Sequence, residues 1–205
     1  MKKEEVISVF GLSKTQIKKI DKYISEIYEF NKHTNIVGRS TQQHVWGRHI
    51  ADCLQLSKYV SEKKSKIFDL GTGGGLPGVL LSIIGYQNVF MVDSVGKKID
   101  FVRDIIKLLS LSAKTQKKRI EKLNIGTADL IVSRALAPLS KLLSYSLLHS
   151  NTNTTCLFLK GRRVYNEIEM AKNYFNFNFK TFKSISSEEG RVLKIQNIQI
   201  KKSND

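Results

Sequence analysis

The 205-residue sequence has few of the residues that build disulfide or metal scaffolds. Its two cysteines, Cys53 and Cys156, are too few for a disulfide framework, and their spacing is no metal-binding motif. The four histidines form no ligand cluster. No apolar run approaches the roughly 18 residues of a membrane span, and the amino terminus opens no apolar signal segment. We therefore expect a soluble, cytoplasmic protein that binds neither a metal nor a membrane.

Acidic residues are also scarce relative to basic ones. The chain has 34 Lys and Arg against 18 Asp and Glu, which gives a net charge of +16. So large an excess predicts a polyanionic partner, most simply RNA or DNA. The alternative is a proteome that uses lysine freely, because the lysines are spread along the chain. A hydrophobic content of 41% is enough for one packed domain, or for a domain with a small appendage.

The most informative stretch runs from Ile67 to Gly78. Its pattern predicts the end of a buried strand, a glycine-rich turn and the start of a helix. Five glycines within eight residues, beginning with Gly71 and Gly73, let the backbone adopt positive φ and come close to a ligand. A strand–turn–helix unit of this kind is where an α/β sheet holds a nucleotide-like ligand.

Three kinds of ligand compete for this turn. A P-loop is excluded because valine, not lysine, follows Gly78. A dinucleotide fingerprint is matched by Gly73–Gly78, with Asp93 about 20 residues on. Asp69, two residues before the first glycine, would repel a pyrophosphate and favour the ammonium and sulfonium groups of S-adenosylmethionine. This carboxylate favours S-adenosylmethionine over NAD, and a glycine turn without any ligand is the structural alternative.

Hydrophobic periodicity predicts two helices before this turn, at about Ser13–Asn31 and Thr41–Tyr59, and then a Lys-rich linker from Ser61 to Lys66. Five strands separated by helices follow, which predicts a doubly wound sheet. The first strand ends at Leu70, and the other four cover residues 88–93, 113–118, 129–134 and 155–160. The intervening helices cover about 78–85, 97–111, 138–149 and 164–174.

The end of the chain has a different pattern. Residues 175–179 and 192–200 look like strands, and only a turn at Ser187–Gly190 and no helix separates them. They should form an antiparallel hairpin at one edge of the sheet. Such a hairpin, without a second nucleotide-binding half, favours a methyltransferase over a dehydrogenase. We predict a single Rossmann-like domain, with residues 1–60 as a helical extension and 61–205 as the mainly parallel α/β core.

Several motifs, taken together, give the chain a family resemblance. They are Asn35–Val37, Arg48–Asp52, Asp69–Gly78, Asp93–Lys98, Ser133–Ala135 and Leu159–Gly161. In this order, over about residues 28–200, they resemble the GidB or RsmG family, the guanine-N(7) methyltransferases of small-subunit ribosomal RNA. The Gly-Leu-Pro-Gly ending and the Asp-Ser-x-Gly-Lys string are the most specific parts. Cys53 departs from the serine usual in the family, and the third-strand region is eroded.

The resemblance implies a class I S-adenosylmethionine-dependent fold. It also implies methyl transfer to nitrogen 7 of one guanine in a decoding-region hairpin of 16S rRNA. The partner would be 16S rRNA or a precursor of the small ribosomal subunit, and we expect a monomer. The cofactor contacts that the resemblance implies are Gly71, Leu76, Ile120, Glu121 and Arg134.

The residues themselves add further cofactor contacts. Asp69 can approach the amino-acid end, and Gly73 belongs to the same turn. Asp93 ends the second strand, where a ribose diol would lie. Three alternatives stay open: Asp93 starts a turn, Arg134 makes a surface ion pair, and Glu121 is a solvated charge.

One motif is missing, and the chemistry explains its absence. Amine methyltransferases often carry an Asn/Asp-Pro-Pro-aromatic string after the fourth strand, where this chain has Ser133–Pro138. Nitrogen 7 of guanine has a free lone pair and no proton, so alignment suffices and no general base is needed. We therefore assign no catalytic acid or base. The candidates for the target pocket are His49, Asp52 and Arg134, although His49 and Asp52, one helical turn apart, are equally well read as a structural pair.

RNA duplexes hide nitrogen 7 in a deep, narrow groove, so the target must be a loop or an opened helix. Basic residues near the carboxyl edge of the sheet are predicted to hold the RNA backbone: Lys97, Lys160, Arg162 and Arg163, together with Arg134. Two other classes remain as alternatives. A non-catalytic RNA-binding module would need neither Asp69 nor the glycines, and a Rossmann oxidoreductase should bind NAD.

Overall fold

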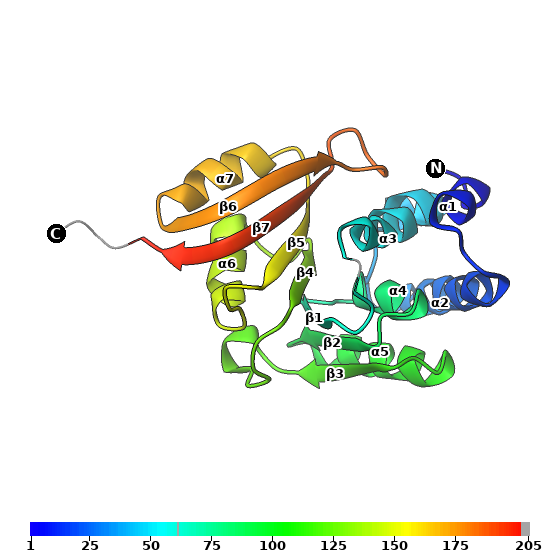
Figure 1. Ribbon diagram of the computed structural model, residues 1–205. Coiled ribbons are helices and arrows are strands. Elements are labelled where there is room, and N and C mark those ends of the chain that lie inside the picture. The colour runs from blue at the N-terminus through cyan, green and yellow to red at the C-terminus, as the bar shows by residue number, and fades with distance from the viewer. Residues whose placement is uncertain (61, 202–205) are drawn as a thin grey trace.

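The fold is a seven-stranded sheet with helices on both faces (Figure 1), seen in a computed structural model that describes residues 1–60 and 62–201. Ser61, at the predicted boundary between extension and core, lies outside the described residues. The strand order is β3-β2-β1-β4-β5-β7-β6. The strands are β1 Lys66–Leu70, β2 Asn88–Asp93, β3 Ala113–Lys117, β4 Leu130–Arg134, β5 Thr155–Lys160, β6 Phe175–Lys183 and β7 Arg191–Ile200.

The first five strands are parallel, as the alternation of strands and helices predicts. The terminal hairpin is antiparallel and forms one edge of the sheet, which confirms that prediction. Strand β7 enters between β5 and β6, so the last strand is not the edge strand. In the first half of β7, Val192, Leu193 and Ile195 are fully buried, whereas β6 is mostly exposed. Burial of these apolar side chains explains why β7 takes the inner position.

Each strand serves two hydrophobic cores, because side chains alternate across the sheet. Ile67 of β1 packs toward the helices of the N-terminal half, whereas Phe68 and Leu70 pack toward the other face. In Figure 1, α1, α2 and α4 lie on one side of the sheet and α6 and α7 on the other. The helices are α1 Lys3–Phe10, α2 Lys14–Asn31, the short α3 Asp52–Leu54, α4 Gly78–Ile83, α5 Gly96–Leu108, α6 Leu139–Leu147 and α7 Val164–Lys172.

Helix α2 confirms the first predicted helix. Ser13 caps its start: its side chain accepts a hydrogen bond from Gln16 N at 3.2 Å, and its own N–H donates to Gln16 Oε1 at 2.9 Å. The face with Ile20, Tyr23 and Ile27 is fully buried in the same core as the sheet residues. Helix α1 was not predicted. It is eight residues long and buries only Val6 fully, so its periodicity is weak.

The predicted regular helix over Thr41–Tyr59 is wrong in detail. The segment is helical but changes form three times, through Arg39–His44 (3₁₀), Trp46–Ala51 (π), α3 and Gln55–Tyr59 (3₁₀). Single π turns widen a helix locally and often occur at functional sites. Here the π turn carries His49, which is buried, and Arg48, which is exposed.

The N-terminal helices are tied directly to the glycine turn. The hydroxyl of Tyr23 on α2 donates a buried hydrogen bond to the carbonyl of Gly74 at 2.6 Å. We predict that Tyr23→Phe lowers the free energy of unfolding by about 1–3 kcal/mol, because a buried carbonyl loses its partner. Urea titration measures this change. Tyr28→Phe is the control, since the Tyr28 hydroxyl on the same helix donates to an exposed carbonyl, that of Gln42. Equal losses in the two variants would contradict the argument.

Candidate cofactor and RNA site

The glycine turn follows β1 and leads into α4. The N–H groups of Gly71 and Thr72 both donate to the carbonyl of Val92 at 2.9 Å, which fixes the turn to the end of β2. Gly71 and Gly73 have φ values of +70° and +57°, where side chains other than glycine are strained. A Cβ at Gly73 would meet nothing within 4 Å, so this glycine faces open space.

Asp69 lies beneath the turn and is fully buried. Its Oδ2 accepts hydrogen bonds from Thr72 Oγ1 at 2.5 Å and from Gly78 N at 2.9 Å. Its Oδ1 has no hydrogen-bond partner among the described residues. Burial raises the pKa of Asp69 to about 7, against the opposing effect of the two hydrogen bonds. Asp69 therefore stabilises the conformation of the turn through Thr72 and Gly78. Its direct contact with a ligand stays a prediction.

Asp93 ends β2 and links the turn to the start of α5. Its Oδ2 accepts a hydrogen bond from Gly73 N at 3.0 Å, and its Oδ1 accepts one from Val95 N at 2.9 Å. The bond from Val95 N to Oδ1 is that of an aspartate that starts a turn, so this alternative interpretation holds for one of the two oxygens. The other oxygen holds the glycine turn at the edge of a cavity.

Two adjoining cavities open at the carboxyl ends of the strands. One, of about 450 Å³, is lined by the glycine turn and includes Leu76 and Arg134. The other, of about 210 Å³, includes Ile120 and Glu121, and Tyr145 donates a 3.1 Å hydrogen bond to Glu121. The two share Gly71, Asp93 and Leu136 in their walls. All the predicted cofactor residues except Asp69 line one or both cavities: Gly71, Gly73, Leu76, Asp93, Ile120, Glu121 and Arg134.

Arg134 is the centre of a polar cluster at the end of β4. Its guanidinium donates to His49 Nδ1 at 2.5 Å, and its Nε lies 3.4 Å from Asp52 Oδ2. Because arginine can only donate, Nδ1 of His49 is an acceptor and the ring proton is on Nε2. Nε2 then donates to Thr41 Oγ1 at 2.7 Å, and that hydroxyl donates to the carbonyl of Gly38 at 2.8 Å. This chain of hydrogen bonds, from Gly38 through Thr41 and His49, fixes the orientation of the Arg134 guanidinium.

The imidazole of His49 is neutral in this cluster. Burial, and after it the positive charges of Arg134 and Arg48, together lower the pKa of His49 to about 4. His49 and Asp52 share no hydrogen bond among the described residues, so they are not a pair with each other. Each contacts Arg134 instead, and both line a third cavity of about 290 Å³. The two side chains are therefore not a structural pair with each other, and their place in a pocket for the target base stays a prediction.

The third cavity contains residues that sequence reasoning missed. Its walls include Thr41 and a loop between β6 and β7, which we call the 184–190 loop and which contributes Ser186, Ser187, Glu189 and Gly190. Asp52 Oδ1 accepts hydrogen bonds from Ser186 Oγ at 2.7 Å and Ser184 Oγ at 3.2 Å. Nothing local in a Ser-rich turn indicates a partner about 130 residues earlier in the chain.

The four predicted RNA contacts differ in their surroundings. Arg162 and Arg163 are exposed in the turn after β5 and form no ion pair with any residue that the structure describes. The side chain of Lys160 is only 9% exposed, and its Nζ contacts Glu167 Oε2 at 2.5 Å and the carbonyl of Ala137 at 3.1 Å. A phosphate would have to compete with this ion pair. The assignment of these residues to RNA stays a prediction.

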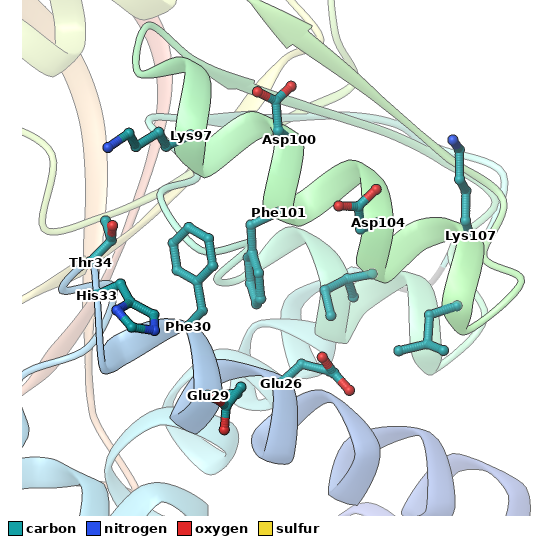
Figure 2. A pocket seen from close by; sticks show the side chains of 12 residues that line it. Glu26, Glu29, Phe30, His33, Thr34, Lys97, Asp100, Phe101, Asp104 and Lys107 are labelled. Atoms are coloured by element: carbon teal, nitrogen blue, oxygen red, sulfur yellow. The ribbon is translucent and has the colours of Figure 1, made fainter.

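Lys97 is exposed on α5 and lines a different cavity, of about 890 Å³, between α2 and α5. Figure 2 shows Phe30 and Phe101 side by side in this cavity, with ring centroids 4.5 Å apart. The glycine turn contributes no residue to it. Over residues 1–60 and 62–201, no helix combines the length and apolarity needed to cross a bilayer. Within the same ranges, no group of three or more His, Cys, Asp and Glu side chains is placed to hold a metal ion.

The sheet order, the glycine turn and the two adjoining cavities define a class I S-adenosylmethionine-dependent methyltransferase. A TehB-like SAM-dependent methyltransferase from Corynebacterium glutamicum has a similar fold, with a TM-score of 0.58 at 17% identity over 86% of this chain and 97% of that one. A family model described as "GidB: rRNA small subunit methyltransferase G" matches residues 16–195. The chain belongs to the GidB family of small-subunit ribosomal RNA methyltransferases.

Curated relatives agree with this assignment. Ribosomal RNA small subunit methyltransferase G of Dinoroseobacter shibae is 37% identical, over 82% of this chain and 89% of that protein. The protein of the same name from Paramagnetospirillum magneticum is 30% identical, over 95% of each chain. The family excludes the two alternative classes, an NAD-dependent oxidoreductase and a non-catalytic RNA-binding module.

The residues around the two cavities fit S-adenosylmethionine. Gly73 leaves open space where any other residue would place a Cβ, so a ligand can lie directly against the backbone. Asp93 and Glu121 offer carboxylates that can accept hydrogen bonds from hydroxyl and amino groups. Ile120 is 7% exposed and Leu76 is equally buried, so both present apolar surface to a ring or a thioether.

Gly73→Ala tests this fit against a matched control. We expect it to weaken S-adenosylmethionine binding at least about tenfold, roughly 1.4 kcal/mol, because a methyl group enters the cavity. Gly11 ends α1 with the same φ of +57° and equally open space, but outside both cavities. Gly11→Ala should lose comparable stability through strain and bind the cofactor normally. Titration calorimetry measures the affinities. Equal effects of the two substitutions on binding would show that strain, not the cavity, is responsible.

Proposed function

We propose that this protein transfers a methyl group from S-adenosylmethionine to nitrogen 7 of guanine 527 in 16S rRNA. One observation carries the proposal beyond the family assignment. We call the 450 Å³ cavity beside the glycine turn the cofactor cavity. Its walls share His49, Arg134 and Ala135 with those of the 290 Å³ cavity. A donor on one side of this wall and an extruded base on the other would therefore be neighbours.

The residues around the cofactor have separate tasks. Gly71, Gly73, Leu76 and Arg134 would hold the end that carries the methyl group, and Asp93, Ile120 and Glu121 would hold the nucleoside end. When bound, the cofactor supplies an electrophilic methyl group whose bond to sulfur breaks as its bond to nitrogen forms, which leaves the positive charge on the guanine ring. Arg134 is held in place by His49 and Asp52, so its guanidinium is oriented before either ligand arrives.

No residue of the cluster needs to act as a base. Nitrogen 7 of guanine carries no proton, and both ring nitrogens of His49 are already hydrogen-bonded. With its pKa near 4, the imidazole stays neutral above about pH 6, so its charge does not change in the physiological range. The chain's contribution is alignment, which is worth several kcal/mol as effective molarity.

This gives a definite pH dependence. We expect the single-turnover rate of methyl transfer, at saturating RNA and cofactor, to vary less than about twofold between about pH 6 and 9. The rate should fall only as the pH approaches the pKa of His49, because an imidazolium would face the positive charge of Arg134. Rapid-quench measurements of methylated RNA follow this rate.

His49→Ala is the sharpest variant for this test. We expect a lower rate and weaker RNA binding, because Arg134 loses its acceptor, with the pH profile still flat. A wild-type rate that rises tenfold per pH unit, and loses this slope in His49→Ala, would show that His49 is a base.

The net charge of +16 supports electrostatic docking of the RNA. The partner we propose is 16S rRNA or a small-subunit precursor in the bacterial cytoplasm. A monomer suffices, because one chain lines all three cavities of the site. Arg162 and Arg163 are exposed at the carboxyl edge of the sheet and directly follow Gly161, which lines the 290 Å³ cavity, so they can contact phosphates beside it.

We predict that replacing Arg162 and Arg163 with Ala weakens RNA binding and flattens its salt dependence. Each lost phosphate contact lowers the slope of log affinity against log salt by about 0.7–0.9. The double substitution Lys14→Ala and Lys18→Ala is the control, because it removes the same amount of charge at another place. These lysines flank Gln16, whose side chain contacts Ile83 at the end of α4 that is farther from the glycine turn. That control should change the slope less. Filter-binding titrations at several salt concentrations measure both, and equal slopes for the two variants would place the RNA elsewhere.

A further inference from the structure

The 184–190 loop is a fixed part of the 290 Å³ cavity. Ser184 and Ser186 donate to Asp52 Oδ1, and the N–H of Ile185 donates to Gln55 Oε1 at 3.1 Å. Gln55 Nε2 also donates to Ser184 Oγ at 2.9 Å. These bonds join the last two strands to the segment before the sheet. The loop therefore stays beside the cavity without help from a ligand.

The cavity has two kinds of wall. His49, Arg134 and Ala135 also line the cofactor cavity, so they lie between the two spaces. Glu189, in the 184–190 loop, lines the 290 Å³ cavity and does not line the cofactor cavity. A base with its reacting nitrogen at the shared wall would turn its opposite edge toward the unshared walls, and the 184–190 loop is one of them.

Guanine has different chemistry on these two edges. Nitrogen 7 and O6 accept hydrogen bonds, whereas N1–H and the N2 amino group, on the other side of the base, donate them. A base with nitrogen 7 at the cofactor side therefore presents donors to the 184–190 loop. The complementary group on the protein is a carboxylate, which only accepts when it is ionised.

Two carboxylates line the cavity, and only one is free. Asp52 accepts three side-chain hydrogen bonds on Oδ1 and pairs with Arg134 through Oδ2. Glu189 is exposed at the rim and has no hydrogen bond or ion pair with any residue that the structure describes. We propose that Glu189 is the residue that selects guanine, by accepting hydrogen bonds from N1–H and the N2 amino group. This inference rests on the proposed function.

The charge of Glu189 has a second effect. Methylation at nitrogen 7 leaves a positive charge on the guanine ring, and a carboxylate at the N1 edge attracts that charge. Adenine presents an unprotonated, accepting N1 at the same position, which a carboxylate repels. Glu189 therefore favours guanine both when the base binds and when the ring becomes charged.

The test uses RNA hairpins with guanine or inosine at the target position, because inosine lacks only the N2 amino group. Affinity is measured with S-adenosylhomocysteine present, so that no transfer occurs. Wild type should bind the guanine RNA about tenfold more tightly than the inosine RNA, as expected for one hydrogen bond to a charged group. Glu189→Ala should bind both RNAs equally. Glu188→Ala is the matched control, since Glu188 is its exposed neighbour and does not line the cavity.

Single-turnover rates separate charge from hydrogen bonding. Glu189→Gln keeps one acceptor without the charge, so it should keep part of the preference for guanine and lose rate about tenfold. It also keeps the side-chain volume, which preserves the test if Glu189→Ala is poorly folded. An undiminished preference for guanine over inosine in either Glu189 variant, or a preference that Glu188→Ala abolishes, would overturn the assignment.

A third RNA, with 7-deazaguanine at the target, distinguishes failure of this inference from failure of the proposed function. It lacks the nitrogen that is methylated and should accept no methyl group from wild type. Methylation of this RNA, or none of the guanine RNA, would contradict the proposed function itself. Methylation of guanine alone, with an unchanged preference in the Glu189 variants, would contradict only the role of Glu189.

Discussion

The site depends on a carboxylate that water does not reach. Asp69 lies under the glycine turn and holds Thr72 and Gly78, the residues on either side of it, through a single oxygen. The other oxygen is buried and has no hydrogen-bond partner in the part of the chain that the structure describes, which lowers the stability of the fold. Glycine is needed in the turn because a Cβ at Gly71 would collide with Leu136 and a Cβ at Gly74 with Ile36. A Cβ at Gly78 would lie 2.8 Å from Asp69 Oδ2, which shows how closely the backbone is drawn to the carboxylate.

Arg134 also holds several segments together, as Asp69 does for the glycine turn. It ends a strand of the sheet, yet its partners His49 and Asp52 come from the irregular helical segment before the sheet. Asp52 in turn holds the 184–190 loop at the other end of the chain. Three segments distant in sequence are thus positioned by one guanidinium and one carboxylate. Since the pair is mostly buried, solvent and salt screen it less than they screen a surface ion pair.

Much of the fold and of the candidate site could be predicted from short stretches of the sequence. The five parallel strands, the glycine turn and Asp93 follow from short apolar runs and from the spacing of glycines and carboxylates, which act within a few residues. The family resemblance supplied Ile120 and Glu121, whose own surroundings in the sequence are unremarkable polar loop. Asp69 could be placed at the end of a strand, but not below the turn, because its partner Gly78 is fixed only when the turn closes. Lys160 looked like a free cation, and only the packing of α7 brings Glu167 against it. The 184–190 loop was read as a turn, since its contacts with Asp52 and Gln55 span the whole sheet.

The order of these segments along the chain has a consequence for synthesis. The last residue that lines either of the two adjoining cavities is Tyr145, whereas the 290 Å³ cavity is also lined by Ser186, Ser187, Glu189 and Gly190. A chain leaving the ribosome therefore has every residue that lines the two adjoining cavities well before it has the 184–190 loop, which forms one wall of the 290 Å³ cavity. The loop is held there by the pairing of β7 with β5, the last strand pairing that the order of synthesis allows together with that of β6 and β7. If this cavity receives the base, as proposed, the part of the site that recognises the base is the last to be synthesised.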